Sequence, residues 1–495
     1  MTIVQSYGTT SVPMPGADCI PEEYAEDIYD LFEVWAKVSA RNRALTTYFD
    51  MKNAIKDLGI SIPEKLTRLN CAVGWCKKAV ESRVVRSRFD GYVFGGETDA
   101  DLSDLVRRNN LRLLYKSAAT SALTHGLSAM TVMRGKYGQP RAKVRAYSAN
   151  QFACLWDKSL DRIKCGIVLH DVDRDGVASC YVAHFDDAVV TFSKDGNGKW
   201  TSDVEDNPMG RPLMEVLVYN RTLDDPLGRT LLTPEIIGIV DKAMRDVLRM
   251  EIGAEFFTFP QRYFLGVADD MFAAPPEPGT PVDEDGNPVD ENGDPLPTVS
   301  SDAMKMQAYI GSILAITKDE DGDIPQVGQF SPAPAENFTR MFENDAQRFS
   351  GATHVPLAQL GVLSNTYTSS DALGAANDPL ILDVELMNES FAPAMEEIAR
   401  MMMAVNGGVP LDGLTRDQMN VEAYFADPSM PTIAARADAW TKFGASDQSI
   451  VGTDVYYEGF GLPKLTIERL KREKEKAGAI STMNGIAEML AGGSR

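Results

Sequence analysis

The sequence predicts an α+β protein in which helical blocks stand before and after a sheet built from hairpins. From Glu22 to about Leu127, apolar residues recur mainly at the three- and four-residue spacing of helices. From about Met130 to Asn220 they alternate with polar residues, in short segments joined by turns that contain Asp and Gly. This period of two is typical of antiparallel hairpins. Because strands and helices occupy separate blocks of the chain, the pattern indicates the α+β class.

The composition limits the kind of protein that this chain can be. Its 495 residues exceed what one hydrophobic core serves, so several domains or subdomains are expected. It carries 71 acidic against 49 basic residues, a net charge of −22. Firm binding of nucleic acid needs clustered Lys and Arg, so this balance argues against a protein that grips phosphates, although it permits loose contact with DNA. Six sparse cysteines predict free thiols, and no signal peptide or membrane span is expected.

The first predicted helix has an apolar stripe formed by Tyr24, Ile28, Leu31 and Trp35. Further helical segments follow it, up to the start of the hairpin region. The stripe predicts that this helix packs with one face against a core.

A long helix is predicted over residues 233–257, directly after the hairpin region. Thr233 as the N-cap and Pro234 at the first helical position mark its start. At 1.5 Å per residue the helix is roughly 37 Å long, which is more than most globular domains need. Its apolar residues form one stripe, and Asp241 and Arg245 fall on another face.

Two more helices are predicted further along the chain. One covers residues 334–350, and a longer one covers about 371–410, where Pro379 and Pro393 are expected to kink it. The insert before them, at about 274–299, is acidic and rich in Pro and Gly, so it is expected to be flexible or poorly ordered.

Catalytic motifs are absent from the sequence: it has no phosphate-binding loop, no dinucleotide-binding glycine pattern and no nucleophile elbow. No catalytic, cofactor-binding or metal-binding residue is therefore predicted. One alternative stays open, because Asp171, Asp173 and Asp175 begin like a calcium loop. His170 and His184 lie in the same sheet region and could meet Asp171 and Asp173 around a metal, although strand ends or solvent-facing positions are favoured for them. A hairpin turn is favoured there, since the twelfth position of the loop holds no Glu.

Four segments of the chain carry a resemblance to a known family. They are "YFDMKNAIKDLGISIPEKL" near the start, "VYNRTLDDPLGRTLLTPEIIGIVDKAMRDVLRMEIGAEFFTFPQRYFLG" in the middle, and then "IGSILAITKDEDGDIPQVGQF" and "PLAQLGVLSNTYTSSDAL". With the order of the predicted elements, they resemble the portal proteins of tailed bacteriophages, specifically the siphophage portals of actinobacterial phages. The resemblance covers about Tyr48 to Val405, and the middle segment is its most specific part. The chain departs from its relatives in "SSDALGA" and in the length of the acidic insert.

The resemblance implies a portal-protein fold with long stem helices, a β-rich wing, a small α/β clip and a helical crown. It implies a ring, usually of twelve subunits, at one capsid vertex, through which double-stranded DNA is packaged and ejected. The implied partners are other copies of the chain, the DNA, the terminase large subunit, the head–tail adaptor protein, and the major capsid and scaffold proteins. No cofactor and no membrane is implied. The protein is expected in the virion, after assembly in the host cytoplasm.

On this resemblance the chain is expected to divide into seven parts. These parts are 1–232 (N-terminal helices and β-rich wing), 233–257 (stem helix), 258–333 (clip with the acidic insert), 334–350 (second stem helix), 351–370 (tunnel loop), 371–410 (long kinked wing helix) and 411–495 (helical crown).

Three groups of residues are expected to carry the implied function. The candidates for facing the DNA channel from the tunnel loop are Leu360, Val362, Leu363, Ser364, Asn365 and Thr366. The candidates for sparse contact with DNA on the stem, with ion pairing within or between subunits as an equal alternative, are Lys242, Arg245, Arg249, Arg340 and Arg348. The residues expected to pack in the clip or against a neighbouring subunit are Phe256, Phe257, Phe259 and Tyr263.

Two other functions compete with a DNA channel. A metal-dependent DNA-processing enzyme would need converging carboxylates, and the three aspartates near residue 173 are the nearest approach to them. A different capsid structural protein would not need paired long helices around an insert.

Overall fold

The computed structural model describes most of the chain, in stretches separated by gaps. These stretches are residues 12–54, 71–94, 100–258, 262–265, 281–282, 289, 326–329, 336–362, 374–429, 433–462, 466–467 and 469–476. The chain divides into two units, Met1–Ala426 and Asp427–Arg495. No helix among these described residues is long and apolar enough to cross a membrane.

Helix α1 (Ala25–Phe49) packs on one face of a five-stranded antiparallel sheet. Its strands, in their order across the sheet, are β4 (Phe152–Asp157), β5 (Arg162–Val172), β6 (Ala178–His184), β7 (Ala188–Lys194) and β8 (Trp200–Asp206). The predicted stripe of α1 is confirmed, because Ile28, Leu31 and Trp35 are buried. The Trp35 ring meets the Tyr181 ring of β6 edge-on, with 6.0 Å between the centroids.

A second, three-stranded sheet lies against the other face of the first. It has the order β3-β2-β9 and consists of β2 (Leu127–Arg134), β3 (Ala142–Ser148) and β9 (Met214–Val218). The predicted antiparallel hairpin region is thus confirmed, but it forms two sheets instead of one. Ala129 and Val216 of the small sheet share a core with Val168 and Val182 of the large sheet.

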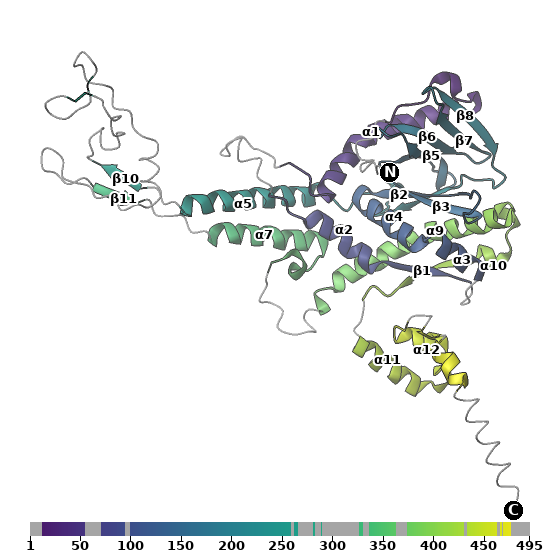
Figure 1. Cartoon of the computed structure of the whole chain (residues 1–495). Coiled ribbons are helices and arrows are strands. Elements are labelled where there is room, and N and C mark those ends of the chain that lie inside the picture. Colours follow the sequence, from purple (N-terminus) through teal and green to yellow (C-terminus); the bar gives the residue numbers. More distant parts are fainter. Residues whose placement is uncertain are drawn as a thin grey trace, which may run out of the picture. The chain divides into compact units, whose positions relative to one another are not determined.

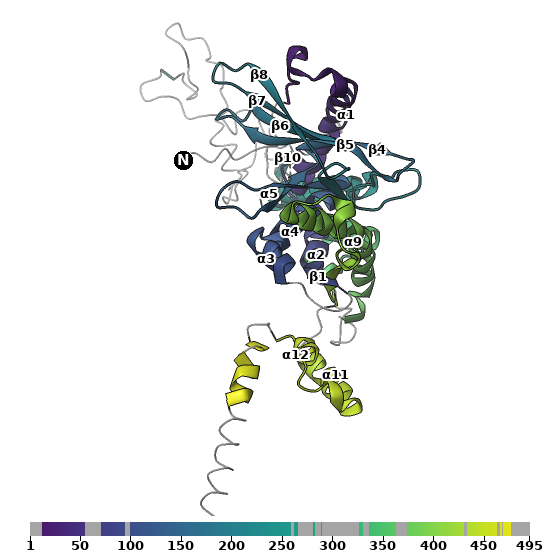
Figure 2. The same cartoon turned by 90° about the vertical axis from the view of Figure 1, so that its right-hand side faces the viewer.

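Two helices cover the outer face of the three-stranded sheet. Met130 and Val132 on this face belong to the main core, which they share with α4 (Leu111–His125) and α9 (Asp378–Gly407). The first unit is therefore layered, with α1, the larger sheet, the smaller sheet and the α4–α9 layer in turn (Figure 1, Figure 2). Pro379 lies in the first turn of α9, where a missing N–H is tolerated, and Pro393 lies inside the helix.

Helix α2 (Trp75–Arg86) leads directly into a strand that the sequence did not indicate. This strand, β1 (Arg88–Phe94), pairs antiparallel with β12 (Val421–Ala426), which comes from the range expected to be helical. Phe89 and Tyr92 of β1 are buried. Two strands that are far apart in the sequence thus share one small sheet.

The remaining elements are short, apart from two long helices. The long ones are α5 (Pro234–Thr258) and α7 (Glu336–Thr353), which lie side by side (Figure 1). Strands β10 (Arg262–Leu265) and β11 (Gln326–Gln329) pair antiparallel. The other helices are α3 (Ala100–Arg108), α10 (Arg416–Met419), α11 (Ile433–Ser446) and α12 (Asp454–Gly459). The 3-10 turns are η2 (Ala17–Cys19), η3 (Glu22–Tyr24), η5 (Leu357–Leu360), η6 (Leu411–Gly413) and η7 (Gln448–Ile450).

Candidate functional site

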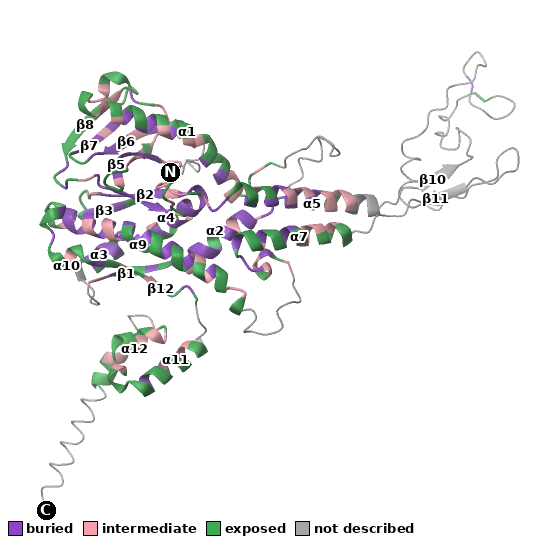
Figure 3. Ribbon diagram, turned by 180° about the vertical axis from the view of Figure 1, so that it is seen from behind, coloured by how far each residue is buried: buried purple, intermediate pink, exposed green. Residues whose placement is uncertain are grey.

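The α5–α7 pair is anchored to the first unit by apolar residues at one end. The first part of the predicted stripe of α5 is confirmed, since Ile236, Val240 and Met244 are buried in the main core. On α7, the rings of Phe342 and Phe349 contact the Trp75 ring of α2, with centroid distances of 5.0 and 5.4 Å. Both helices are buried where they join the body of the first unit and become half-buried or exposed away from it (Figure 3). The core of the first unit therefore fixes one end of each long helix.

A buried ion cluster joins α5 to α7. The Nζ atom of Lys242 lies 2.6 Å from Oδ1 of Asp345 on α7 and 3.9 Å from Oδ2 of Asp246, one turn further along α5. Arg249 donates to Oδ1 of Asp246 at 2.6 Å. Both carboxylates are fully buried, and their Oδ2 atoms accept no hydrogen bond from any described residue. Burial raises the pKa of Asp246, and the charge of Asp345 adds to this effect.

The cluster changes the interpretation of the predicted stem cations. Lys242 and Arg249 are held by buried aspartates, and Arg340 pairs with Glu336 at 2.7 Å on the exposed side of α7. Arg245 and Arg348 have no carboxylate partner among the described residues, and Arg348 is exposed. Three of the five candidates are thus neutralised within the chain, and two keep a charge available for another molecule.

Asp241 of α5 was predicted to lie on a face other than the apolar stripe, and the structure shows that its side chain is covered there. It is buried, and its Oδ1 accepts a hydrogen bond of 2.8 Å from the hydroxyl of Tyr48 in α1. The end of α1 covers this side of α5, which the helical period by itself does not reveal.

Some predicted loop and clip residues are buried, and others lie outside the described residues. Leu360 is buried in the main core, and Val362 packs against that core, so both have packing roles within the chain. The other tunnel-loop candidates, which lie outside the described residues, are Leu363, Ser364, Asn365 and Thr366. Of the clip candidates, Phe256 and Phe257 belong to α5 and Tyr263 belongs to β10, with side chains that are not described. Phe259 and most of the predicted insert are outside the described residues as well.

Arg83 on α2 joins α7 to α9, a role that no pattern in the sequence indicated. Its guanidinium is almost completely buried and donates to the carbonyl of Thr353 at 2.7 Å and to Oδ2 of Asp383 at 2.6 Å. Thr353 is the last residue of α7, and Asp383 lies in the second turn of α9. His354 adds a contact of 3.0 Å from its Nδ1 to the same Asp383 oxygen. Helix α2 therefore holds the end of α7 and the start of α9 together.

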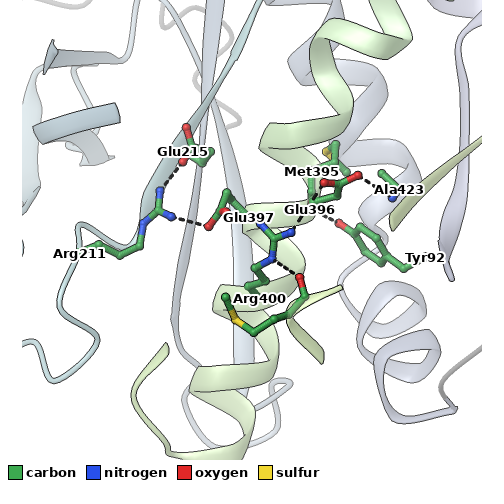
Figure 4. A network of polar contacts seen from close by, with 9 residues as sticks. Tyr92, Arg211, Glu215, Met395, Glu396, Glu397, Arg400 and Ala423 are labelled. Atoms are coloured by element: carbon green, nitrogen blue, oxygen red, sulfur yellow. Dashed lines mark hydrogen bonds and ion pairs between the residues drawn. The ribbon is translucent and has the colours of Figure 1, made fainter. Parts of the chain in front are cut away.

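A second polar network holds the middle of α9 against the smaller sheet (Figure 4). Arg211, in the loop before β9, pairs with Glu215 of β9 at 2.7 Å and also with Glu397 of α9. Arg400, one turn further along α9, pairs with Glu397 too and lies 3.8 Å from Glu396. Two arginines thus share three carboxylates, so the network keeps one unbalanced negative charge when all are ionised.

The same stretch of α9 binds the β1–β12 sheet. Tyr92 of β1 donates its hydroxyl to the carbonyl of Met395 at 2.8 Å, and Glu396 accepts the backbone N–H of Ala423 in β12 at 3.4 Å (Figure 4). Arg400 donates to the carbonyl of Met419 at 2.9 Å. One turn of α9 therefore orders a sheet and a short helix from distant parts of the sequence.

Glu215 makes a pH-dependent contribution to stability that can be measured. Burial raises its pKa to about 6, although Arg211 opposes the shift. The folded protein then holds this proton more tightly than the unfolded chain does, so the free energy of unfolding falls as pH rises from about 4.5 to 6. Glu215→Gln removes this loss. The variant should gain about 1.5 kcal/mol relative to the parent protein between pH 4.5 and 6.5 in urea unfolding. A difference between the two proteins that stays constant over this range would contradict the prediction.

Of the aspartates that resembled a calcium loop, Asp171 lies near the end of β5, and Asp173 and Asp175 lie in the turn between β5 and β6, as favoured. The carboxylate of Asp173 accepts the backbone N–H groups of Asp175 and Val177, and Gly176 supplies the left-handed backbone that the turn needs. His184 ends β6, but its ring is fully buried, and this burial lowers its pKa to about 4. No group of three potential metal ligands occurs among the residues that the structure describes.

The described residues thus form a layered α+β body that carries two long helices joined by buried ion pairs. The family model described as phage portal protein, SPP1 Gp6-like, matches residues 32–477, which is most of the chain. The chain therefore belongs to the phage portal protein family, and the resemblance found in the sequence is confirmed. Portal proteins are structural components of the virion and are not enzymes, in agreement with the prediction.

Two curated relatives match almost the whole chain. The portal protein of Mycobacterium phage L5 is 26% identical over 485 residues, which cover 95% of this chain and 92% of the relative. The portal protein of Mycobacterium phage D29 is 26% identical over 487 residues, with the same coverage. A solved chain from the neck of an empty gene transfer agent particle is 14% identical, with a TM-score of 0.44 over 85% of this chain and 93% of that one.

Proposed function

We propose that this portal protein assembles into a ring of twelve copies at one capsid vertex, and that double-stranded DNA passes through the ring during packaging and ejection. The observation that carries the proposal is the α5–α7 pair. Helix α5 has 25 residues, or about 37 Å, but burial by its own chain ends at Leu248. From there to Ala254 every residue is half-buried or exposed, including the apolar Met250 and Ile252 (Figure 3). Such a helix fits a ring in which neighbouring copies cover what one chain leaves open.

The parts of the chain take the following roles in this proposal. Helices α5 and α7 are the stem, the sheets with α1 and α9 are the wing, and β10 with β11 belongs to the clip. The segment between α7 and α9 is the tunnel loop that approaches the DNA. The region from residue 427 on belongs to the crown; its start is later than the residue 411 expected from the sequence, because β12 pairs with β1 inside the first unit.

The proposed partners act at different stages of particle assembly. Major capsid and scaffold proteins surround the ring, the terminase large subunit binds the clip during packaging, and the head–tail adaptor protein replaces it afterwards. Assembly takes place in the host cytoplasm. Family membership supports each of these partners.

Arg245 and Arg348 are the proposed positions of sparse contact with DNA phosphates. Each phosphate contact must break as DNA advances, so few free cations suit a conduit. The pairing of Lys242, Arg249 and Arg340 with carboxylates of the same chain supports a weakly binding stem.

Purified full-length protein should form rings in negative-stain images, with a central hole about 20–40 Å wide, enough for a duplex whose major groove alone spans about 12 Å. Native mass spectrometry should give twelve copies for each ring. Monomers, or cleavage of DNA that depends on a divalent metal, would overturn the proposal.

The role of Arg245 and Arg348 is tested with the double variant Arg245→Ala, Arg348→Ala. Negative-stain images of this variant should still show rings. DNA binding measured at several salt concentrations should depend less on salt for these rings than for rings of the parent protein. Loss of the rings in this variant would show instead that the arginines pair with a neighbouring subunit.

A further inference from the structure

The imidazole ring of His184 is buried in the first unit without a hydrogen-bond partner among the described residues. His184 is the last residue of β6 and is 0% exposed, and neither of its ring nitrogens bonds to a described group. The other buried histidine is different, because the ring nitrogens of His125 lie 2.9 Å from Oγ1 of Thr46 and 3.1 Å from Oγ of Ser121. A neutral imidazole carries one donor and one acceptor, so its burial without partners costs free energy.

The strand pattern places the His184 ring between the two sheets. Tyr181 and Ala183 of β6 belong to the core beneath α1, whereas Val182 belongs to the core between the larger and the smaller sheet. Side chains alternate along a strand, and the pairing of β6 has no register shift from Val182 to His184. His184 therefore lies on the same face as Val182 and points toward the smaller sheet.

The two sheets approach each other closely beside His184. Its partner in β5 is Gly166, where an added Cβ would lie 2.5 Å from Sδ of Met214 in β9. Cys154 of β4 pairs with Gly166 from the other side, so Cys154 and His184 occupy one row of the same face. Cys154 and Met214 are buried as well. A hydration shell around the His184 ring therefore requires that the sheets separate at this row.

The side chains that face His184 do not stabilise a charge on its ring. The titratable and charged side chains on the two facing surfaces are Lys143, Arg145, Tyr147, Cys154, His170, Cys180, Asp203 and Glu205. The two carboxylates of this set lie on the exposed strand β8. Asp186 and Asp187, in the turn after β6, are held by other partners. A protonated imidazole has two donors and needs acceptors or water for both, so in the closed packing its charge would stay unpaired.

Protonation of His184 and separation of the sheets are therefore linked. Burial lowers the pKa of His184 to about 4, and the charge of His170 lowers it further. In an opened or unfolded chain the ring has its ordinary pKa of about 6.5 and binds a proton more readily than in the closed packing. As pH falls from about 6.5 to about 4, the closed packing loses stability relative to the opened form, and above this range His184 adds no pH dependence.

We propose that His184 is an acid-sensitive switch between the two sheets: the neutral ring permits their closed packing, and the protonated ring forces them apart at its row. The proton comes from the solvent, and the charged ring finds its acceptors in the water that enters. This inference goes beyond the proposed function. The switch lies within one chain and does not require a ring.

Two native thiols of the chain form a matched pair that tests the switch. Cys154 lies between the sheets in the row of His184, and Cys165 of the neighbouring strand lies on the opposite face, beneath α1. Both are buried, and burial raises the pKa of each to about 12. Full-length protein is labelled at about pH 7 and about pH 4.5 with dithiodipyridine, a disulfide that reacts with thiols even in acid, and mass spectrometry identifies the labelled cysteines. The ratio of the Cys154 rate to the Cys165 rate should rise at least about tenfold at the lower pH.

Three variants show whether His184 is the responsible group. His184→Leu and His184→Gln remove the titrating ring, so in both variants the ratio of the two labelling rates should change by less than about twofold between the two pH values. His170→Gln is the matched control, since it removes the other histidine of the same face. This variant should retain the rise of the ratio in acid.

Each result decides for or against the switch. A ratio that stays constant in the parent protein overturns the inference, and so does a rise that persists in both His184 variants. Equal acceleration of both thiols in acid also overturns it, because this shows unfolding of the whole first unit and not separation of the sheets. If one His184 variant does not fold, the other variant and the parent protein still give the decision. Failure of ring formation would contradict the proposed function and leave this test unchanged.

Discussion

Replacing Arg83 with alanine is expected to lower the free energy of unfolding of the first unit by about 3–5 kcal/mol, measured in urea. The reason is that the buried guanidinium satisfies two polar groups at once. Without it, the carbonyl of the buried Thr353 loses its donor at 2.7 Å, and Asp383 keeps the more exposed His354 as a partner. The substitution also leaves a cavity where one of the largest fully buried side chains lies.

Two further variants separate the polar contribution of Arg83 from its packing. Arg83→Met keeps most of the volume and loses the hydrogen bonds, so its destabilisation should lie between zero and that of the alanine variant. Arg107→Ala is the matched control, since Arg107 pairs with Asp104 at 2.6 Å while its side chain is 80% exposed. It should cost no more than about 0.5 kcal/mol. Equal losses for the buried and the exposed arginine would show that burial of the Arg83 ion pair contributes nothing.

Replacing Lys242 with methionine is the second change with a large expected effect, a loss of about 2–4 kcal/mol. It leaves the carboxylates of Asp246 and Asp345 buried close together, with Arg249 as the remaining cation that pairs with either of them among the described residues. The loss should be smaller than for a completely buried pair, because the Lys242 side chain is 36% exposed and its ammonium is partly solvated. Urea unfolding of the variant and of the parent protein measures the loss of stability. The fraction of protein that forms rings is the second readout.

The double variant Lys242→Met, Asp345→Asn tests the cause of that loss. Removing the second charge relieves the unbalanced burial, so the double variant should recover at least about 1 kcal/mol relative to Lys242→Met alone. A double variant whose loss of stability relative to the parent protein equals the sum of the two single losses would refute the electrostatic explanation.

The candidate site shows how far sequence patterns reach for charged residues. The spacing of Lys242 and Arg249 around Asp246 is visible in the sequence as one-turn pairs, so pairing within α5 was a foreseeable alternative to DNA contact. The role of Asp345 was not foreseeable, because it reaches Lys242 from a helix that is separated from α5 by residues 259–335. Arg83 was missed for the same reason, since nothing in the sequence distinguishes it from the other charged residues of α2 or indicates the distant carboxylate that accepts its hydrogen bond.

The sequence by itself determined the α+β class, the hairpin region, the two long helices and the family. These features follow from local spacing and from motifs, which are properties of neighbouring residues. Only the tertiary structure decided that the hairpins form two sheets, that β1 pairs with β12, and that Arg83, Arg211 and Arg400 hold α9 in place. The physical reason is that "RFDGYVF" and "VEAYFA" are too short and too mixed in polarity to identify a strand without its partner. Their stability comes from pairing and burial between segments far apart in the chain, and a local pattern contains no information on such contacts.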